Sequence, residues 1–585
     1  VIIMEINNEE TVINYVNNFK TFTNNNFDFS DFQNKACNSI VNKEHVLITA
    51  HTGSGKTLPA EFAIYYFIKV LNKKVIYTSP IKALSNQKYK EFTTKFNDIE
   101  VGILTGDIKH NPNADLLIMT TEILQNNCFK KQNRGLYMDF NIDIENELGC
   151  VIFDEVHYID DYDRGTVWEQ TMIMLPDNVI FVMLSATIGH KEQFAQWIEN
   201  IKNRKVTICS NETRVVPLNF YEFFSIPKKY IDNIKNKDKK VMFENKLNKK
   251  LNLIKNNKVY CYEHLKNSSK CLKETSKDNY RIYNKYVINE CLDHLRDNDM
   301  FPSIFFVFSR KNVEKIASQI TTNLFLKDEK DYQIEPVYRN MIVKKLNNWK
   351  EYMEIPEYKI YLDLLEKGIG IHHAGMLPVF REVIEQLYEQ KYIKALIATE
   401  TFAIGLNMPT RTVIFSSLYK HDGNKLRLLK SHEFTQMAGR AGRRNIDTVG
   451  HVILLSNCYN PPTEIEYYNL FHTKPKVLVS KFKLTYNIIL NYLNDYSKND
   501  FVNMVNKSLM NNDIISQKNY SKKQLELYSE QKKRNDELIN TLDFDVIQYF
   551  KEKNELEERM KYSNNKTKKQ LKKKIDEIFD KKKDI

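Results

Sequence analysis

The chain of 585 residues is too long for one hydrophobic core, and its apolar share of 42% is ample for several packed domains. No run of about 18 apolar residues is present and the N-terminus lacks the pattern of a signal peptide, so we expect neither a membrane span nor a secreted protein. The net charge of +12 favours polyanionic partners, which basic side chains bind through phosphate contacts.

The eight cysteines lie far apart in the sequence and none forms a Cys-x-x-Cys pair, which argues against a zinc site. Scattered cysteines without a signal peptide are typical of a reducing compartment, so we expect an intracellular protein of the cytoplasm or nucleus. The first residue is Val1 rather than methionine, so the sequence does not establish the natural start of the chain.

After an N-terminal extension over residues 1–26, apolar strands alternate with helical segments from 27 to 213. The strands are short, rich in β-branched residues and apolar along almost their whole length, which indicates a parallel sheet buried on both faces. The intervening segments are long enough for crossover helices. The predicted strands lie at 45–49, 74–78, 115–119, 150–153 and 179–184.

Residues 214–284 are polar and rich in lysine and asparagine, so we predict a linker or insertion there, with a short strand near Val259–Tyr262. A second alternating block follows over 285–458. Its predicted strands lie at 303–308, 369–372, 395–398, 412–415 and 451–455. The sequence therefore predicts an α/β protein with two tandem parallel-sheet lobes, which is the arrangement that a nucleotide cleft between lobes requires.

The remainder of the chain is predicted to be helical. A small helical domain is expected after Tyr459, over residues 459–519. Residues 520–585 are rich in lysine and glutamate, with apolar residues at irregular helical spacings. This composition favours a solvated helix or coiled-coil arm over a dedicated RNA-binding tail.

The segment Ala50–Thr57 follows a predicted strand and precedes a predicted helix, although Ala50 replaces the first glycine of the phosphate-binding loop pattern. Glycines allow backbone N–H groups to turn toward phosphates at the positive end of a helix. Lys56 is suited to the β- and γ-phosphates and Thr57 to Mg²⁺. A plain glycine-rich turn is the alternative. The predicted nucleotide-binding residues of this loop are Thr52, Gly53, Ser54, Gly55, Lys56 and Thr57.

Two adjacent carboxylates, Asp154 and Glu155, end a buried strand and should therefore lie at the carboxyl edge of the first sheet, where ligands bind in open α/β folds. Asp154 is suited to holding Mg²⁺ through water, and Glu155 to polarising the water that attacks a phosphate. An acidic strand cap is the alternative, which the neighbouring phosphate-binding loop makes the weaker interpretation.

The second lobe contains two arginines, Arg440 and Arg443, in the segment Gln436–Arg444. They are three residues apart, about one helical turn, so we expect both to face the cleft. Arginine fingers on the opposite lobe would make ATP hydrolysis depend on closure of the lobes. A basic helix that binds nucleic acid is the alternative interpretation.

Taken in order, four segments make the chain resemble a superfamily-two DExH helicase: Ala50–Thr57, Asp154–His157, Leu184–Thr187 and Gln436–Arg444. Narrower features resemble the superkiller-type subfamily, which includes RNA helicases that feed the exosome. These features are Thr78–Lys88, Arg164–Glu169, Gly370–Pro378, Ala398–Pro409 and Phe482–Leu490. The similarity covers about residues 27–512.

The resemblance implies two RecA-like lobes, over 27–213 and 285–458, and a winged-helix region over 459–519. It also assigns roles around the nucleotide. Gln33 matches the residue that reads adenine, and Gly405 falls in a motif of the nucleotide site. His157 and Gln436 match residues that bridge the lobes near the γ-phosphate. The implied catalytic residues are thus Lys56, Glu155, Gln436, Arg440 and Arg443.

The resemblance further implies a path for a nucleic-acid strand. Ser185 and Thr187 match the motif that couples hydrolysis to strand movement. Contacts in this family go largely to the sugar–phosphate backbone, so movement should be mostly independent of sequence and directed from 3′ to 5′. The residues implied to contact the strand are Lys82, Gln87, Gly106, Thr121, Glu122, Arg310, His373 and Thr399.

Asp422–Gly423 lies between alternating apolar and polar residues, which is a strong signal for a β-hairpin. The corresponding hairpin of the related helicases sits at the duplex junction and splits strands. Tyr419 or Leu418 is the residue that would stack on the last base pair. A plain connecting hairpin remains the alternative.

The related helicases continue past the winged-helix region into a helical bundle with a ratchet helix, and RNA-processing members insert an arch of two long helical arms. Here Phe501–Leu509 resembles the point at which the arch begins, and the chain stops at Ile585. We therefore expect a fragment, or a shortened enzyme without the ratchet.

These features together predict an ATP-dependent helicase that uses ATP and Mg²⁺ and binds single-stranded or 3′-tailed nucleic acid, with an RNA-decay or processing complex as partner. The Asp-Glu-Val-His segment and the arch-like start favour RNA over DNA, and a DNA helicase of the same broad group is the second interpretation. A nucleic-acid-stimulated ATPase clamp that does not separate strands is the third.

Overall fold

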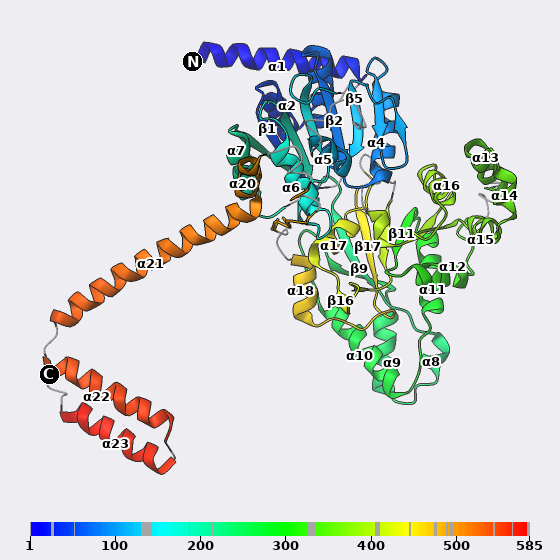
Figure 1. Ribbon diagram of the computed structural model, residues 1–585. Coiled ribbons are helices and arrows are strands. Elements are labelled where there is room, and N and C mark those ends of the chain that lie inside the picture. The colour runs from blue at the N-terminus through cyan, green and yellow to red at the C-terminus, as the bar shows by residue number, and fades with distance from the viewer. Residues whose placement is uncertain are drawn as a thin grey trace. The chain divides into compact units, whose positions relative to one another are not determined.

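The computed structural model describes residues 2–24, 28–51, 53–129, 142–186, 188–211, 214–325, 334–403, 410–443, 446–472, 477–486, 489–490, 497–541, 544–563 and 565–581. The chain divides into two compact units, Val1–Met504 and Val505–Ile585. The first unit contains two lobes, each built on its own sheet (Figure 1). Among the described residues, no helix is both long enough and apolar enough to cross a membrane.

The first lobe is built on an eight-stranded sheet in the order β4-β3-β5-β2-β6-β7-β1-β8. Neighbouring strands are parallel except β3 and β4. The central strands are buried along their length, which explains their continuous apolar character. The strands are β1 (His45–Ala50), β2 (Lys74–Ser79), β3 (Val101–Leu104), β4 (Lys109–His110), β5 (Leu116–Thr120), β6 (Leu148–Phe153), β7 (Ile180–Ser185) and β8 (Val206–Asn211).

Helices connect these strands and cover the sheet, because parallel strands need long crossover connections. The N-terminal helix packs onto this lobe through the fully buried Phe19, whose ring lies 5.7 Å from that of Phe62. The helices are α1 (Ile2–Phe22), α2 (Asp31–Val41), α3 (Leu58–Tyr65), η1 (Tyr66–Val70), α4 (Lys82–Lys95), α5 (Thr121–Phe129), η2 (Val156–Asp160), α6 (Gly165–Met174) and α7 (Lys191–Lys202).

The second lobe is built on a seven-stranded sheet in the order β10-β9-β17-β14-β11-β13-β12, in which only the edge strand β10 is antiparallel to its neighbour. The predicted architecture of two largely parallel sheets is confirmed. The strands are β9 (Leu218–Phe223), β10 (Leu251–Lys255), β11 (Ser303–Phe306), β12 (Ile369–His372), β13 (Ala395–Ala398), β14 (Thr412–Phe415) and β17 (Gly450–Leu455).

Residues 214–284 differ from the linker that the sequence predicts, because they contribute β9 and β10 to the second sheet. Most residues of β9 are only half-buried, and burial alternates along β10, as in an edge strand. Neither strand therefore has the continuous apolar run by which the other strands are recognised. The strand predicted near Val259–Tyr262 reduces to one bridge between Lys255 and Tyr260.

The helices of the second lobe surround its sheet, and α13 to α15 form an additional layer next to α16. They are α8 (Lys228–Asp232), α9 (Lys237–Leu247), α10 (Glu263–Lys277), α11 (Asn284–Asp297), α12 (Arg310–Gln319), α13 (Ile334–Lys345), α14 (Trp349–Glu354), α15 (Pro356–Leu365), α16 (Pro378–Glu389), η4 (Glu400–Ala403), α17 (Ser431–Ala438) and α18 (Glu464–His472).

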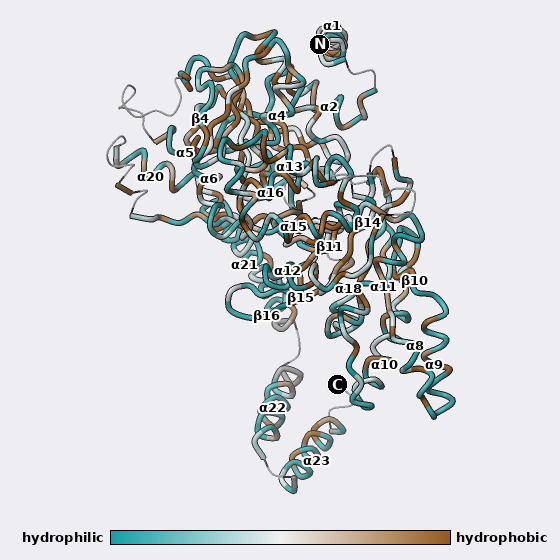
Figure 2. Tube along the Cα trace, turned by 90° about the vertical axis from the view of Figure 1, so that its right-hand side faces the viewer, coloured by the Kyte–Doolittle hydropathy of each residue, from teal (hydrophilic) through white to brown (hydrophobic). Residues whose placement is uncertain are grey.

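Each lobe has its own hydrophobic core, and Figure 2 shows the apolar stretches concentrated inside the lobes. A third, smaller core lies among α8, α9 and α10. Its buried members are Phe224, Ile226, Tyr230, Ile231, Phe243 and Cys271. Three separate cores agree with the expectation that a chain of this length folds as several domains.

The predicted β-hairpin is confirmed: β15 (Tyr419–His421) pairs with β16 (Leu426–Leu428), and Gly423 has a φ of +100° in the turn. The described residues after β17 form α18 and α20 (Lys498–Asn506). The second unit is helical, with α21 (Leu509–Thr541), α22 (Phe544–Lys561) and α23 (Asn565–Lys581). It begins at Val505, earlier than the boundary predicted at residue 520.

Candidate nucleotide site and strand-contacting surface

The phosphate-binding loop connects β1 to α3, as its sequence predicts. Gly53 and Gly55 have φ values of +82° and +87°, which glycine adopts without strain. A Cβ built on Gly53 would meet nothing within 4 Å, so this part of the loop borders open space. Ser54 closes the loop by donating its hydroxyl to the His51 carbonyl at 2.7 Å. Thr57 is the N-cap of α3, and Thr52 lies outside the described residues.

Gln33 holds this loop from α2. Its side-chain amide donates to the carbonyl oxygen of Gly55 at 3.0 Å, and its oxygen accepts the N–H of Ser30 at 2.9 Å. The residue is 3% exposed. The side chain predicted to read adenine is therefore also a tether of the phosphate-binding loop.

Lys56 and Glu155 form an ion pair, with the ammonium 2.7 Å from Oε1 of the carboxylate. Glu155 lies directly after β6 in a left-handed conformation with a φ of +56°, which turns its side chain away from the strand direction. Burial raises the pKa of Glu155, but the positive charges of Lys56, His157 and Arg440 outweigh it and hold the pKa well below its usual range. Glu155 is thus kept ionised beside the phosphate-binding loop.

Asp154 is buried and accepts a hydrogen bond of 2.6 Å from the hydroxyl of Tyr77, a residue of β2. Burial raises the pKa of Asp154, and the neighbouring Glu155 carboxylate raises it further. A carboxylate that is costly to ionise without a cation is suited to receive one. The two adjacent carboxylates therefore have opposite electrostatic environments.

His157 connects Glu155 to the next strand. Its Nδ1 lies 3.3 Å from Oε2 of Glu155 and 3.4 Å from the hydroxyl of Ser185, the last residue of β7. Of the predicted coupling residues, His157 therefore contacts the predicted base directly and Ser185 contacts His157. Thr187, the third residue of that set, lies outside the described residues, as does Gly405 of the predicted nucleotide site.

The two arginines of the second lobe do not share a helix face, contrary to the prediction from their spacing. The helix α17 ends at Ala438, and Arg440 and Arg443 lie in the following turn, where Gly442 has a φ of +88°. Gly439 is the C-cap of the helix, and the positive φ of Gly442 takes the chain out of the helical conformation before Arg443. The helical spacing of the two arginines was thus misleading.

The charge of Arg440 acts on residues of the first lobe. Burial lowers the pKa of its guanidinium, and the charges of Glu155 and Tyr158 act against that effect. Arg214 supports the turn by donating to the carbonyl oxygens of Gly439 and Ala441 at 2.8 and 2.6 Å. The structure therefore brings one cationic side chain of the second lobe to the carboxylate predicted as the base.

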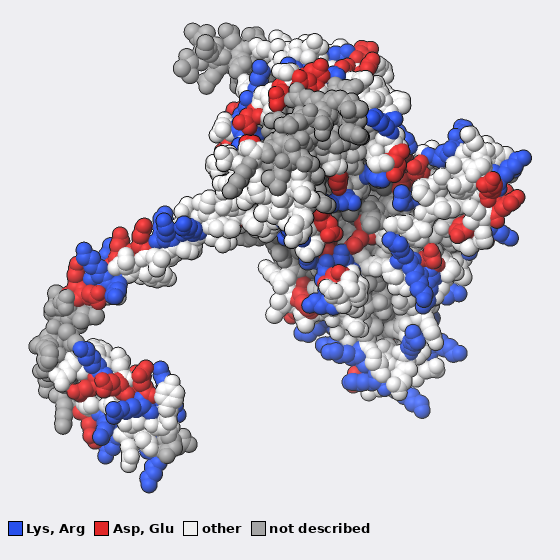
Figure 3. Space-filling view, viewed as in Figure 1, with Lys and Arg blue, Asp and Glu red and all other residues white. Residues whose placement is uncertain are grey.

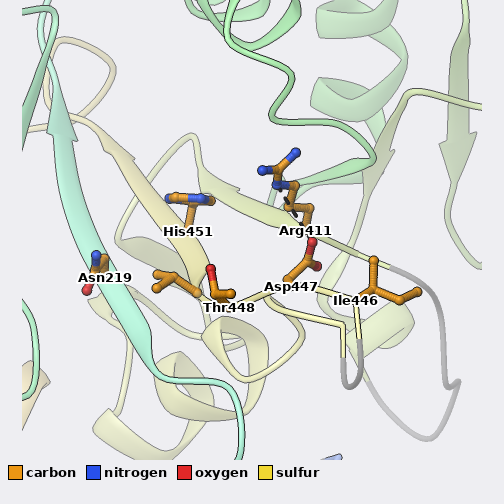
Figure 4. A pocket seen from close by; sticks show the side chains of 7 residues that line it. Asn219, Arg411, Ile446, Asp447, Thr448 and His451 are labelled. Atoms are coloured by element: carbon orange, nitrogen blue, oxygen red, sulfur yellow. Dashed lines mark ion pairs between the residues drawn. The ribbon is translucent and has the colours of Figure 1, made fainter.

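Arg443 is instead held within the second lobe. Its Nε and Nη2 donate to the two carboxylate oxygens of Asp447, both at 2.8 Å. Nε of Arg411 lies 3.7 Å from the same carboxylate. Arg411 and Asp447 border a pocket (Figure 4). It is lined by Asn219, Arg411, Ile446, Asp447, Thr448, Val449 and His451. Gln436, predicted to bridge the lobes, is half-buried on α17.

The strand-contacting residues predicted in the first lobe lie at the ends of β2, β3 and β5. Lys82 is exposed and pairs with Asp107 at 2.7 Å, next to Gly106. Glu122 lies 3.8 Å from the Arg164 guanidinium. Thr121 is fully buried, so its hydroxyl does not reach the surface. Gln87 is half-buried on α4.

The strand-contacting residues predicted in the second lobe follow β11, β12 and β13. Arg310 is exposed at the start of α12. His373 is 3% exposed, with Nε2 at 3.3 Å from Glu314 and Nδ1 accepting the N–H of Gly375 at 3.1 Å. Thr399 is half-buried and donates its backbone N–H to the carbonyl of His372. These residues share one sheet edge, which is where strand-contacting loops are expected.

After the second lobe, residues 477–486 return to the first lobe. Ser480 donates to the buried Glu169 at 2.7 Å, and Thr166 donates to the carbonyl of Lys481 at 2.5 Å. The ammonium of Lys481 lies 3.3 Å from Asp160, and Val477 bridges to Gly189. The segment Arg164–Glu169 is therefore in contact with the residues directly before Phe482–Leu490, although the two lie about 300 residues apart in the chain.

An ion network ties the β-hairpin to α17. Glu433 of α17 accepts two hydrogen bonds from the Arg427 guanidinium, at 2.8 and 2.9 Å, and lies 2.9 Å from the Lys420 ammonium. Leu418, one of two residues predicted to stack on a base pair, is fully buried and cannot do so. The exposed apolar side chain near the tip is Leu426, which is 66% exposed.

Sequence reasoning missed the residues that support the site rather than form it. Four such residues each hold a predicted residue or its loop through a hydrogen bond. They are Tyr77, Arg214, Asp447 and Glu433. Asp447 alone had a local signal, since it lies four residues after Arg443. The other three belong to no short motif, so only the fold reveals them.

No group of three or more His, Cys, Asp or Glu residues within the described ranges could hold a metal ion. Mg²⁺ commonly binds at a different type of site, in which one carboxylate and one hydroxyl act together with the phosphate oxygens of a bound nucleotide. Asp154 and Thr57 provide that donor set. All eight cysteines are free thiols, and six of them are buried.

Comparison with known proteins identifies two domains. Residues 30–194 match the DEAD/DEAH box helicase family, and residues 346–445 match the helicase conserved C-terminal domain. The chain is 37% identical over 514 residues to the antiviral helicase SKI2 of Saccharomyces cerevisiae, covering 80% of this chain and 38% of that protein. It is 38% identical over 468 residues to the human exosome RNA helicase MTR4, covering 80% of this chain and 42% of that protein.

The Arabidopsis thaliana DExH-box ATP-dependent RNA helicase DExH9 is similar in the same way, with 37% identity over 480 residues, 80% of this chain and 45% of that protein. The chain therefore spans less than half the length of the curated relatives named here. With the two sheets, the phosphate-binding loop and the Asp-Glu-Val-His segment arranged as described, the chain belongs to the superfamily-two helicases of the superkiller type.

Proposed function

We propose that this chain is an ATP-dependent RNA helicase that moves from 3′ to 5′ along single-stranded RNA and separates duplexes ahead of it. The observation that carries the proposal is the grouping of Lys56, Asp154 and Glu155 at one sheet edge of the first lobe, with the charge of Arg440 acting on Glu155 from the second. A structural protein has no need for this combination.

The phosphate-binding loop fits a nucleoside triphosphate with Mg²⁺. Gly53 borders open space and both glycines have the positive φ that directs backbone N–H groups toward phosphates. Lys56 would hold the β- and γ-phosphates, and Thr57 and Asp154 would hold the ion. Bound Mg²⁺ supplies charge neutralisation for the departing phosphate.

The Lys56–Glu155 pair sets the order of events. In the structure the two charges neutralise each other at 2.7 Å. A triphosphate competes with Glu155 for the Lys56 ammonium, because phosphate oxygens carry more charge than one carboxylate. Once released, Glu155 remains ionised and can accept a proton from the attacking water. Substrate binding itself thereby activates the base.

The contacts of Glu155 also provide a route by which turnover affects the lobes. Glu155 contacts His157, which contacts Ser185, and Arg440 approaches from the second lobe. A change in charge at Glu155 during the cycle therefore acts on both lobes. Arg443 would have to exchange Asp447 for the γ-phosphate when the lobes close.

RNA is the proposed strand, because the relatives named above are described as RNA or antiviral helicases. By the same reasoning we propose an intracellular role in RNA decay or processing. We also propose that residues 459–519 form a winged-helix region and that residues 520–585 form a charged helical or coiled-coil arm. The hairpin, with Leu426 or Tyr419 at the junction, would part the strands.

The test is an unwinding assay with 3′-tailed and 5′-tailed duplexes of RNA and of DNA, with ATP turnover measured alongside. We expect unwinding of the 3′-tailed RNA duplex only, and loss of turnover with retained ATP binding in Glu155→Gln. RNA-stimulated turnover without unwinding would instead support a clamp, and a preference for DNA tails would overturn the RNA assignment.

A further inference from the structure

One part of the second lobe has an excess of positive charge nearly as large as the net charge of the whole chain. Residues 224–281, here named the basic module, contain sixteen lysines and arginines but only six aspartates and glutamates. Their excess of ten positive charges compares with +12 for the whole chain. Figure 3 shows Lys and Arg outnumbering acidic residues at the lower end of the lobe, where Figure 1 labels α8, α9 and α10.

The helix α10 separates these charges from the core. Leu265, Ser268, Cys271 and Thr275 are buried on one side. The exposed lysines recur at intervals of four, three and four residues, which places them on the opposite side of the helix. They are Lys266, Lys270, Lys273 and Lys277. At 1.5 Å per residue they form a basic row about 16 Å long.

The lysines of this row are not required for the fold of the module. Lys246 is an example of a lysine with a structural role in this module, because it is buried and donates a hydrogen bond to the buried Glu222. By contrast, Lys266, Lys270 and Lys273 form no ion pair with any residue that the structure describes, and Lys277 pairs with Glu274 at 2.6 Å. Like charges in a row repel one another, so the row lowers stability unless a polyanion binds it.

The position of the module relates it to the hairpin. The Tyr260 ring packs against His472 of α18 with centroids 4.9 Å apart, and Lys255 donates to the carbonyl of Phe471. In turn, α18 contacts α17, to which the hairpin is tied through Glu433. The strand contacts predicted in this lobe follow β11, β12 and β13, at the other end of the sheet order. The module therefore lies on the hairpin side of the lobe.

We propose that Lys266, Lys270 and Lys273 form a second nucleic-acid contact, which binds the phosphate backbone of the RNA duplex before the hairpin separates it. Regularly spaced lysines on a straight helix suit a regular duplex backbone, and the contact is independent of base sequence. This inference rests on the proposed function for the identity of the polyanion, but its site is separate from the cleft.

The test compares a triple Lys→Gln variant at 266, 270 and 273 with a matched control, Lys344→Gln with Lys350→Gln and Lys359→Gln. The control lysines are exposed on α13, α14 and α15 of the same lobe. Affinity is measured against salt concentration for a 3′-tailed RNA duplex and for the single-stranded tail alone. Thermal melts confirm that each variant is folded.

For the duplex, the salt slope of log affinity should become shallower by about 2 to 3 in the α10 variant, since each duplex phosphate contact contributes about 0.9. The control should keep the wild-type slope, and the tail alone should bind all three proteins equally. A charge-reversed triple Lys→Glu variant should weaken duplex binding further.

Unchanged duplex binding would overturn the inference. Equal losses on the tail alone, or in the control, would also overturn it, because they would indicate a general charge effect. Association with an acidic protein in place of RNA would do the same. Absence of RNA-stimulated ATP turnover in the wild type, with the duplex-specific difference intact, would count against the proposed function and leave the second contact standing.

Discussion

The two lobes hold the side chains that are predicted to be catalytic in different ways. In the first lobe Lys56, Asp154, Glu155 and His157 lie at the end of parallel strands and, apart from Asp154, contact one another directly. In the second lobe the two arginines lie in a turn beyond the end of a helix. Arg214 holds this turn, and Arg443 is paired to Asp447. Of Arg440 and Arg443, Arg440 is the one whose charge acts on the first lobe.

This difference shows how a site divided between two lobes can have one half fully formed while hydrolysis still waits for the other half. A parallel sheet brings its strand ends to one edge, so the first half of the site is formed by folding alone. The second half depends on loop contacts that can be exchanged. Hydrolysis would then be controlled by the less rigid half.

The largest expected effect comes from removing the charge that acts across the lobes. Arg440→Ala should lower ATP turnover by about 10³-fold or more, because arginine fingers contribute that much to phosphoryl transfer. Nucleotide binding should persist through the phosphate-binding loop. Steady-state turnover and binding of a fluorescent ATP analogue measure the two effects, and a loss below about tenfold would place the catalytic arginine elsewhere.

Arg443→Ala should affect stability as well as turnover, unlike Arg440→Ala. It leaves the Asp447 carboxylate, whose side chain is 5% exposed, without its bidentate partner. We expect a loss of about 2 to 3 kcal/mol in unfolding free energy by chemical denaturation. The double variant Arg443→Ala with Asp447→Ala should regain stability without regaining turnover. Equal stability of Arg443→Ala and Arg440→Ala would show that the Arg443–Asp447 pair is unimportant for stability.

Glu433→Gln should separate unwinding from hydrolysis. The carboxylate holds Arg427 and Lys420 of the hairpin, and these bonds outweigh burial and hold the pKa of Glu433 at about 2. Without the charge the hairpin loses about 1 kcal/mol of anchoring, so unwinding should fall about fivefold. RNA-stimulated turnover should stay near the wild-type rate. A parallel fall in both rates would contradict a role confined to the hairpin.

The smallest effect concerns Asp154, whose pKa is raised by burial and by Glu155. A raised carboxyl pKa favours the folded state below the unfolded pKa and loses that advantage as pH rises through the folded pKa. Asp154→Asn should therefore melt at a slightly higher temperature than the wild type near pH 7, and at the same temperature near pH 3, below the unfolded pKa. Melts without Mg²⁺ check this, and a gap that widens toward acid would reverse the sign.

The part of the candidate site in the first lobe, which is formed by folding alone, is also the part that can be predicted from the sequence. Lys56, Asp154 and Glu155 follow strands with continuous apolar runs, so their position at a sheet edge follows from the pattern. The spacing of Arg440 and Arg443 suggests a shared helix face. The helix instead ends before Gly439, and both arginines lie in the turn that contains Gly442. The partners of these arginines could not be predicted, because Arg214 comes from a segment more than 200 residues away.

The fold shows the same limit. Strands β9 and β10 lie among lysines and asparagines and have no apolar run, so the segment resembles a linker. Their membership of the second sheet depends on pairing with β17, which is a long-range contact. The same pairing places the basic module on the lobe, a position that composition alone could not predict.

The return of residues 477–486 to the first lobe means that the polypeptide crosses between the lobes twice, once before β9 and once after α18. Two halves joined at two points can rotate about the line through both points, but they cannot drift apart or twist freely. A double connection of this kind would favour a hinge-like swing for opening and closing. Such a swing would give each hydrolysis event the same stroke, which is what a motor with a fixed step size needs.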